Sequence, residues 1–268
     1  MRQSLTLAAG LTIAVLAATA AAQEHVLKRL EASPRHQEWV AIKNGERTVH
    51  AFVVYPERKD KTAVVVVIHE NRGLTDWVRG VADQVAEAGY IAVAPDLLSG
   101  TAPGGGKTSD FPSSDAAREA ISKLTPDGVT SDLDALAAWA TKLPAANGKL
   151  AVGGFCWGGG QTFRYATHNR DLAAAFPFYG AFQHTKEDLA KIACPVHGFY
   201  GGDDARINAT IPATDSTMKR LSKSYEFHIF DGAGHGFLRG QEQSPANLAA
   251  AQQAWPKTVA FFRAKLGR

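Results

Sequence analysis

The sequence predicts an α/β fold in which a mostly parallel central sheet carries helices on both faces. From residue 62 to the end of the chain, short apolar segments alternate with longer segments of helical character, which is the pattern of repeated strand–helix units. The chain has 268 residues, 45% of them hydrophobic, and no low-complexity segment divides it. This composition suits a single domain with one full core over residues 23–268.

The expected elements follow one another along the chain in a regular order. An opening hairpin is expected from strands at 38–43 and 48–55, because Asn44-Gly45 between them is a tight-turn signal. Further strands are expected at 62–69, 90–95, 149–155, 173–179, 195–200 and 225–230. Helices are expected near 75–88, 113–124, 129–142, 158–168 and 244–266, with others between the last strands. In such a sheet the reactive loops gather at the carboxyl ends of the strands.

Residues 1–22 are expected to be a cleavable signal peptide rather than part of the fold. Arg2 supplies a positive start, residues 5–16 form an apolar segment, and Ala20-Ala-Ala22 resembles a small-residue cleavage site. The apolar segment is shorter than the roughly 20 residues that span a bilayer, which disfavours an uncleaved membrane anchor. We therefore expect a secreted or periplasmic protein, with no stable membrane insertion after cleavage.

Charge and motif content argue against several classes of partner. The net charge is +3 with no dense basic cluster, so a nucleic-acid partner is not expected. Gly104-Gly-Gly-Lys-Thr108 resembles the end of a phosphate-binding loop, but Thr101 stands where that pattern needs glycine. The nine histidines show no recognised metal-ligand spacing, and His69 and His197 are expected to be core or loop residues. We expect no metal, no cofactor and a monomeric chain.

A cysteine between two glycines marks the most informative turn of the chain. Gly154-Phe-Cys156-Trp-Gly158 joins the strand expected at 149–155 to the helix that follows it. The spacing G-x-C-x-G matches the nucleophile elbow, a sharp turn that exposes a nucleophile above a parallel sheet, with cysteine replacing the usual serine. Glycine at 154 and 158 allows the strand and helix backbones to approach closely. The alternative is a buried structural cysteine in a glycine-rich turn.

An acid and a histidine follow Cys156 in the order that this architecture requires. Asp204 lies in the tight turn after the strand expected at 195–200. His235 follows the strand expected at 225–230, within a glycine-rich segment. Three residue types of a catalytic triad therefore each follow an expected strand end.

Asp203 is the alternative acid. The spacing from Asp204 to the apolar Ile207, which can anchor the loop in the core, favours Asp204. Asp203 is then expected to face solvent or to cap the next helix.

The expected roles follow from proton affinities. A free thiol has a pKa of about 8.5 and only the thiolate attacks, so the cysteine needs a base. His235 would accept the thiol proton and Asp204 would orient the imidazole ring. The Trp157 N–H, at the start of a helix, would be one oxyanion donor. The second would be the Asn71 N–H, in the loop after the strand expected at 62–69.

The second cysteine, Cys194, is not expected to pair with Cys156. Cys156 would lie at the carboxyl edge of the sheet, whereas Cys194 precedes its strand and would lie at the opposite edge. A disulfide needs Cα atoms within about 7 Å, and a strand of this length spans about 17–20 Å. Cys194 is therefore expected to be a buried structural thiol.

Several motifs, taken in order, resemble those of the dienelactone hydrolases, which have the α/β-hydrolase fold and a cysteine nucleophile. The resemblance covers roughly residues 40–265 and includes nearly all of the expected domain. It rests on Glu70-Asn-Arg-Gly73, Gly89-Tyr-Ile-Ala-Val-Ala-Pro-Asp-Leu97, Asn147-Gly-Lys-Leu-Ala-Val-Gly-Gly-Phe-Cys-Trp-Gly-Gly159, Gly201-Gly-Asp-Asp204 and Gly234-His-Gly-Phe-Leu-Arg239.

The resemblance implies roles for three further residues. Glu70 would help to convert Cys156 from thiol to thiolate when substrate arrives, and Arg239 would bind a substrate carboxylate. Arg118 matches the family's second arginine by a looser alignment. The simpler alternative is that Glu70 and Arg239 pair with each other, and that Arg118 faces solvent. The large indole of Trp157 departs from the family pattern and is expected to reshape the acyl pocket.

These observations together predict a cofactor-free hydrolase of small esters or lactones, with carboxylate-bearing substrates preferred. Cys156 would form a thioester that water then releases. Two alternatives are a binding protein that keeps the fold without turnover, and a thioesterase or peptidase-type hydrolase on the same scaffold.

Overall fold

The computed structural model describes residues 26–181 and 183–267. The expected signal peptide, residues 1–22, lies outside these ranges. Within the described residues, no helix is both long and apolar enough to cross a membrane.

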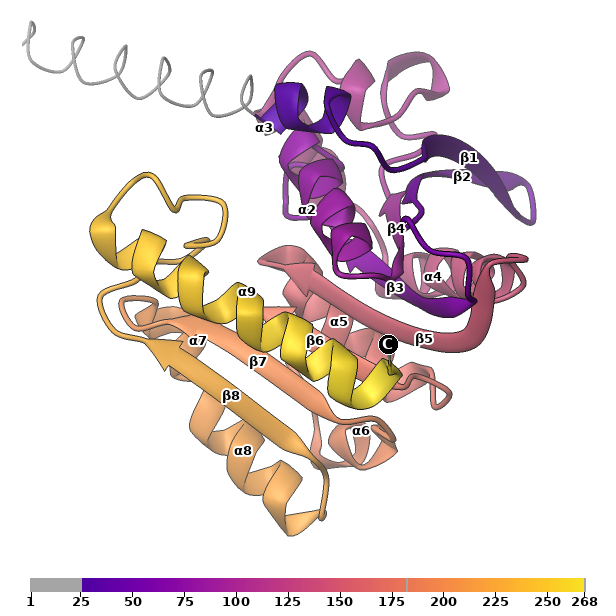
Figure 1. Cartoon of the computed structure of the whole chain (residues 1–268). Coiled ribbons are helices and arrows are strands. Elements are labelled where there is room, and N and C mark those ends of the chain that lie inside the picture. Colours follow the sequence, from indigo (N-terminus) through magenta and orange to yellow (C-terminus); the bar gives the residue numbers. More distant parts are fainter. Residues whose placement is uncertain (1–25, 182, 268) are drawn as a thin grey trace, which may run out of the picture.

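In the described part of the chain, eight strands form one sheet in the order β1-β2-β4-β3-β5-β6-β7-β8 (Figure 1). The hairpin strands β1 and β2 are antiparallel, and β2 also runs antiparallel to β4. From β4 to β8, neighbouring strands are parallel, so the predicted sheet is confirmed. The strands are β1 Gln37–Asn44, β2 Arg47–Val54, β3 Thr62–Ile68, β4 Ile91–Asp96, β5 Ala146–Phe155, β6 Ala174–Phe178, β7 Val196–Gly201 and β8 Tyr225–Phe230.

Helices cover both faces of the sheet, and each face has its own apolar core. One core joins the sheet to α2 and α9, and the other joins it to α4, α5, α6 and α8. Figure 1 shows α9 lying across β6, β7 and β8. The helices are α2 Asp76–Glu87, α3 Ser114–Ser122, α4 Pro126–Ala140, α5 Trp157–His168, α6 Lys186–Lys191, α7 Ala205–Asn208, α8 Ile211–Arg220 and α9 Pro245–Leu266, with short 3₁₀ turns at Pro103–Gly105 and Thr108–Asp110 and a helical segment over residues 26–31.

One helix starts earlier than the sequence pattern predicts. α4 begins at Pro126 rather than near 129, because the Thr125 side chain accepts a hydrogen bond from the Gly128 N–H and caps the helix. Proline at the first helical position costs no hydrogen bond, since the N–H there has no intrahelical partner. The first turn is exposed, so apolar periodicity alone does not locate this boundary.

The segment that resembles a phosphate-binding loop instead joins two loops at the carboxyl edge of the sheet. The Thr108 hydroxyl donates to Asp96, at the end of β4, over 2.7 Å and accepts from the Leu74 N–H, after β3, over 3.0 Å. A Cβ at Gly73 would lie 2.2 Å from the Thr108 hydroxyl, so glycine is needed at that position. Thr108 therefore helps to fix the loop that carries Glu70.

Candidate active site

Cys156 occupies a strained turn between β5 and α5. Its backbone has φ +55° and ψ −113°, and its N–H donates to the Phe178 carbonyl over 3.0 Å. A non-glycine residue in this region costs about 1–3 kcal/mol, and such strain is typical of functional sites. A Cβ at Gly158 would lie 2.4 Å from the His69 carbonyl oxygen, and one at Gly154 would lie 2.5 Å from the Gly158 oxygen. Both glycines are needed for the close packing of the turn.

A chain of two hydrogen bonds joins Cys156, His235 and Asp204. The Cys156 Sγ lies 3.1 Å from His235 Nε2, and His235 Nδ1 lies 2.5 Å from Asp204 Oδ2. Asp204 is only 7% exposed and also accepts from the Ile207 N–H at the start of α7. Asp203 faces solvent instead. The structure therefore brings together the three residues that the sequence singles out.

The electrostatic surroundings of His235 favour its protonated form. The hydrogen bond to the Cys156 sulfur is the largest cause, and the contact with Asp204 adds to it; together they outweigh burial and raise the pKa of His235 to about 9. At neutral pH the imidazole therefore carries a proton on each nitrogen, one directed at the sulfur and one at the carboxylate. A protonated ring of this kind can act as a general acid toward a group bound at the sulfur.

Glu70 and Arg239 pair with each other beside the triad. Arg239 Nε donates to Glu70 Oε2 over 2.6 Å, and Glu70 is 6% exposed. A Cβ at Gly236, next to His235, would lie within 4 Å of both side chains. The structure thus shows the simpler alternative from the sequence, a Glu70–Arg239 pair. The pair nevertheless borders the triad, where a substrate group could compete for the arginine.

Two further residues border this site that the sequence analysis does not assign. Tyr179 follows β6, is fully buried, and places its ring 5.3 Å from that of His235 in an edge-on contact. Its hydroxyl has no hydrogen-bond partner among the described residues. Burial first, and then the carboxylate of Glu70, raise the pKa of Tyr179. The tyrosyl group is therefore a neutral hydroxyl with an unused donor. In the sequence, Tyr179 could have been singled out by its position at the carboxyl end of an expected parallel strand, where functional residues gather.

Arg72 is the second residue that was missed. It lies within the Glu70-Asn-Arg-Gly73 motif and is half-buried. Burial and the positive charges of Arg239 and Arg118 lower the pKa of Arg72, which shows that the three guanidinium groups share one electrostatic neighbourhood. Arg118 itself is largely exposed and pairs with Asp115 over 2.8 Å on α3. Arg118 therefore lies at the rim of the site rather than within it.

The expected oxyanion donors belong to Trp157, at the start of α5, and to Asn71, in the loop after β3. Trp157 is the first residue of α5, and a helix offers no internal acceptor for the N–H at that position. Its indole stacks on His69 with ring centroids 5.3 Å apart. His69 Nδ1 lies 2.7 Å from the Glu70 carbonyl, and its Nε2 accepts from the Leu97 N–H. His69 therefore fixes the turn that leads into Asn71.

The Trp157 indole also contacts a small cluster formed by the loop after β4 and by α3. The buried members of this cluster are Leu98, Ala117 and Ile121. Trp157 thus links the elbow to the helix that carries Arg118.

The two cysteines are free. Cys194 is buried, and burial raises its pKa to about 11. A thiol with that pKa is a poor nucleophile near neutral pH, which leaves Cys156 as the reactive cysteine of the chain.

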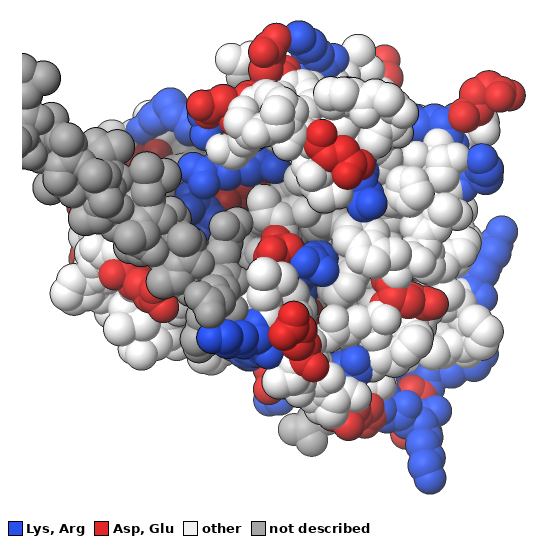
Figure 2. All heavy atoms as spheres, turned by 90° about the horizontal axis from the view of Figure 1, so that it is seen from above, with Lys and Arg blue, Asp and Glu red and all other residues white. Residues whose placement is uncertain are grey.

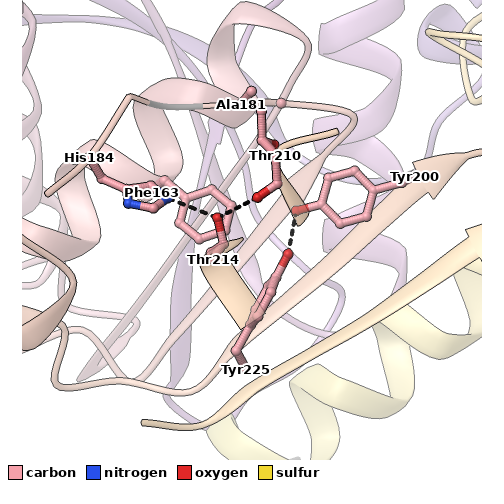
Figure 3. Close-up of a pocket in the computed structure, with 8 residues that line it drawn as sticks. Phe163, Ala181, His184, Tyr200, Thr210, Thr214 and Tyr225 are labelled. Atoms are coloured by element: carbon pink, nitrogen blue, oxygen red, sulfur yellow. Dashed lines mark hydrogen bonds between the residues drawn. The ribbon is translucent and has the colours of Figure 1, made fainter. Parts of the chain in front are cut away.

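A small pocket near the loop after β6 is separate from the triad (Figure 3). His184 lies 2.8 Å from the Thr214 hydroxyl, and the hydroxyls of Tyr200 and Tyr225 lie 2.9 Å apart. Its polar groups thus already bond to one another, so this pocket is a weaker candidate for chemistry. Its lining residues are Phe163, Gly180, Ala181, His184, Tyr200, Thr210, Thr214 and Tyr225.

The face seen in Figure 2 mixes basic and acidic side chains with wide uncharged areas. Over the part of this face that the structure describes, no broad surface of one sign is visible. A continuous basic surface is what phosphate backbones require. The expectation of no nucleic-acid partner stays a prediction.

Comparisons with known proteins agree with the α/β-hydrolase fold. The family model of the dienelactone hydrolase family matches residues 49–266. Proteins named "Putative carboxymethylenebutenolidase" are 31% identical in Yersinia pestis, over 79% of this chain and 82% of the relative, and 29% identical in Escherichia coli K12, over 80% and 81%. The crystal structure of a "Putative Dienelactone Hydrolase" from Klebsiella pneumoniae aligns with a TM-score of 0.75 at 25% identity, covering 85% of this chain and 98% of that one.

Proposed function

Because this chain belongs to the dienelactone hydrolase family and is an ester or lactone hydrolase, we propose that it cleaves small carboxylate-bearing substrates through a thioester on Cys156. The observation that carries the proposal is the hydrogen-bonded chain from Cys156 through His235 to Asp204 on a strained elbow. In that chain the thiol is the nucleophile, the imidazole transfers protons and the carboxylate orients the imidazole.

The reaction begins with attack by the Cys156 thiolate on the substrate carbonyl carbon. The new C–S bond places negative charge on the carbonyl oxygen, which the backbone N–H groups of Trp157 and Asn71 would stabilise. When the tetrahedral intermediate collapses, the C–O bond breaks and the His235 imidazolium gives its proton to the departing alkoxide. The products of this step are an alcohol and a thioester on Cys156.

Water completes the cycle. The imidazole of His235, now neutral, takes a proton from a water molecule as that water attacks the thioester carbonyl. The C–S bond then breaks, releasing the carboxylic acid and restoring the thiolate beside the imidazolium. Asp204 holds the ring in place throughout.

The charges around the triad support a preference for acidic substrates. A substrate carboxylate that reached Arg239 would compete with Glu70 for the guanidinium, with a bidentate geometry available to it. Arg72 adds a second positive charge in the same neighbourhood. Glu70, once released from Arg239, would be a free base next to the segment that holds His235, in line with the switching role that the family resemblance implies.

Tyr179 supports a binding role for the residues beside the triad. A buried hydroxyl without a partner costs about 1–3 kcal/mol. A substrate oxygen that accepted its hydrogen bond would remove that penalty and would be held next to His235 and Glu70.

We also propose that the chain works outside the cytoplasm, on the strength of residues 1–22 alone. Those residues have the charge, the short apolar segment and the small-residue end of a signal peptide. Processing at residue 22 would leave the described domain intact. N-terminal sequencing of the exported protein tests this, and a retained Met1 in the membrane fraction would contradict it.

The proposed function is tested with pairs of small esters and lactones that differ only in a free carboxylate against its methyl ester. We expect kcat/KM to favour the acidic member of each pair by about 10-fold or more, which is the worth of a charged hydrogen bond. The Cys194→Ala variant is the matched control, because it removes the other thiol, and it should keep full activity.

The remaining results distinguish the alternatives. Turnover without preference for the acidic member would be compatible with Cys156 as the nucleophile but would exclude a contribution of Arg239 to substrate preference. Tight binding of the panel without turnover would favour a binding protein, and cleavage of peptides or thioesters in preference to esters would favour the peptidase-type alternative.

A further inference from the structure

A second cluster of reactive side chains lies on β7 and β8, near the ends at which these strands begin. His197, on β7, pairs in register with Glu226 on β8, and His228 follows Glu226 by two residues on the same face. The His197 Nε2 lies 3.8 Å from Glu226 Oε1, and the His228 Nε2 lies 3.6 Å from the same oxygen. The three ligand atoms all lie within 4.8 Å of one another.

His197 is the unusual member of this cluster. It is 6% exposed, and neither ring nitrogen has a hydrogen-bond partner among the described residues. Buried imidazoles are normally hydrogen-bonded, because a polar atom loses its hydrogen bonds to water on burial and needs a partner in the protein to replace them. Its ring instead stacks on Phe199 and meets Phe261 of α9 edge-on. The packing thus fixes the ring in place, and both ring nitrogens remain without a hydrogen-bond partner among the described residues.

We propose that His197, Glu226 and His228 bind a divalent transition metal, of which Zn²⁺ is the best match. Two imidazole nitrogens and one carboxylate oxygen are a ligand set that zinc takes in proteins, with a further position open to water. Zinc–ligand bonds of about 2.0–2.2 Å place tetrahedral ligand atoms about 3.4 Å apart. The 3.8 and 3.6 Å distances from Glu226 to the two imidazoles need only a small contraction, and the two imidazole nitrogens, within 4.8 Å of each other, would move closer together.

The surroundings of the cluster allow a metal to enter. Glu226 and His228 have side chains that are 69% and 29% exposed, so they open the buried His197 to solvent. Burial lowers the pKa of both imidazoles, which keeps them in the neutral form that binds metals. The exposed Lys257 of α9 also faces the two histidines and opposes a cation. Removing its charge should therefore tighten binding.

The position of the site separates it from the triad. His197 lies near the start of β7, whereas Asp204 lies in the turn beyond its end. The stretch of strand from His197 to Gly201 alone spans about 13 Å at about 3.3 Å per residue. β8 is the edge strand of the sheet. A metal held between β7 and β8 would cross-link that edge to the rest of the sheet, so we expect it to stabilise the fold without taking part in ester cleavage.

The test uses the full chain carrying Cys156→Ala, since the active-site thiol can itself bind zinc. After treatment with a chelator and dialysis, we would titrate the protein with ZnCl₂ by calorimetry. We expect one Zn²⁺ per chain and a higher melting temperature in its presence. Cobalt(II) in place of zinc should give the d–d absorption of a four- or five-coordinate site.

The variants identify the ligands. Glu226→Gln lies on an exposed position and should fold normally, and it should weaken zinc binding about 100-fold. His197→Phe keeps the aromatic packing and should abolish binding, whereas Lys257→Gln should tighten it. His36→Gln is the matched control, because His36 lies 3.8 Å from Glu38 in an exposed pair, and it should have no effect.

Either of two results would overturn the proposal. One is a Cys156→Ala protein that binds no zinc at all. The other is zinc binding that survives Glu226→Gln and His197→Phe unchanged. Neither result would affect the proposed hydrolase function, because esterase activity is measured in the chelator-treated chain with an intact Cys156.

Discussion

Two histidines of the neighbouring strands β7 and β8 and their loops have opposite environments. His235, in the loop after β8, is held between the Cys156 sulfur and the Asp204 carboxylate, and these partners raise its pKa to about 9. His197, near the start of β7, has no hydrogen-bond partner among the described residues, and burial lowers its pKa to about 4. Both are imidazoles in one fold, so the difference comes entirely from their neighbours.

The comparison shows how this fold divides its chemistry between the two ends of the strands. At the carboxyl ends, partners stabilise the protonated ring, which suits proton transfer. Near the other ends, aromatic packing without partners stabilises the neutral ring, which suits metal binding. Removing the partners of His235, or replacing His197, should therefore have different consequences.

The largest effect should come from removing the sulfur partner of His235. Cys156→Ala should lower kcat by about 10³-fold or more, because no nucleophile remains to form the thioester. The melting temperature should change little, since alanine keeps the backbone and adds no volume. Steady-state assays on the best acidic ester, with circular dichroism as the folding control, measure both. Turnover within a few-fold of the parent protein would exclude Cys156 as the nucleophile.

The next effect should come from removing the carboxylate partner. Asp204→Asn should lower kcat/KM by about 10²–10⁴-fold, because general acid–base catalysis by a correctly oriented imidazole contributes a factor in that range. His235 is protonated below about pH 9 in the parent protein, so kcat/KM should fall as the pH rises through that value. Because Asp204 contributes to the raised pKa, the fall should begin at a lower pH in the variant.

The neighbouring carboxylate provides the control for this change. Asp203→Asn alters an exposed side chain next to Asp204 and should leave the pH profile as it is in the parent. Identical alkaline limits in the Asp204→Asn and Asp203→Asn variants would contradict the account of His235.

The charge beside the triad should have an intermediate effect. Arg239→Gln should raise KM for carboxylate substrates about 10–100-fold while neutral esters change little, because a charged hydrogen bond contributes about 1.5–3 kcal/mol. The substitution also leaves Glu70 buried without its cation, which should lower stability by about 2–3 kcal/mol after allowance for partial exposure of the pair.

The double variant Glu70→Gln with Arg239→Gln separates these two consequences. It should recover most of the lost stability, as measured by urea unfolding, but not the affinity for acidic substrates. Equal losses of kcat/KM on acidic and neutral esters would show that Arg239 acts on structure rather than on the substrate.

A smaller effect is expected at His197, on the pH dependence of stability measured in the presence of a chelator. In the unfolded chain the pKa of His197 is about 6.5, whereas in the fold it is about 4. The unfolded state therefore binds more protons between these values, and stability should fall as the pH drops from 6.5 toward 4. Glu226, His228 and Lys257 face the ring and shape this titration.

His197→Phe removes the titrating group and keeps the aromatic packing. Between pH 6.5 and 4.5 its melting temperature should therefore fall less than that of the parent, by about 4–8 °C, because these pKa values correspond to about 2 kcal/mol over this range and 1 kcal/mol shifts the melting temperature of a domain of this size by about 2–4 °C. Scanning calorimetry at several pH values measures this. Parallel curves for the two proteins would show that the buried ring does not resist protonation.

The smallest effect is expected at the rim. Arg118→Gln removes an exposed arginine that already pairs with Asp115. Exposed pairs contribute about 1 kcal/mol or less, so KM for acidic substrates should rise about fivefold at most. A change as large as that of Arg239→Gln would place Arg118 in direct contact with the substrate.

The alternation of apolar and helical segments was sufficient to predict the fold, because each strand is short, apolar and bounded by turn residues. The elbow at Cys156 was also predictable, because the turn requires glycine at fixed positions. The structure shows that Gly154 and Gly158 have no room for a side chain. The choice of Asp204 followed from its spacing to the apolar Ile207, which is buried in the structure.

Other features depend on contacts that the sequence does not encode locally. The partnership of Glu70 and Arg239 joins residues that are 169 positions apart. The cluster of His197, Glu226 and His228 exists only because β7 and β8 pair in one register, and a shift by one residue would move Glu226 and His228 to the other face. Arg72 and Tyr179 were missed because neither residue type is distinctive until its neighbours are known.

The most direct test of the central claim is intact-mass spectrometry of the protein during turnover of an acidic ester, followed by peptide mapping. The thioester account predicts a mass increase equal to the acyl group, located on the peptide that contains Cys156 and not on that of Cys194. It also predicts that the adduct disappears when substrate is exhausted. Turnover with no acyl adduct under rapid quenching, or an adduct on any residue other than Cys156, would contradict it.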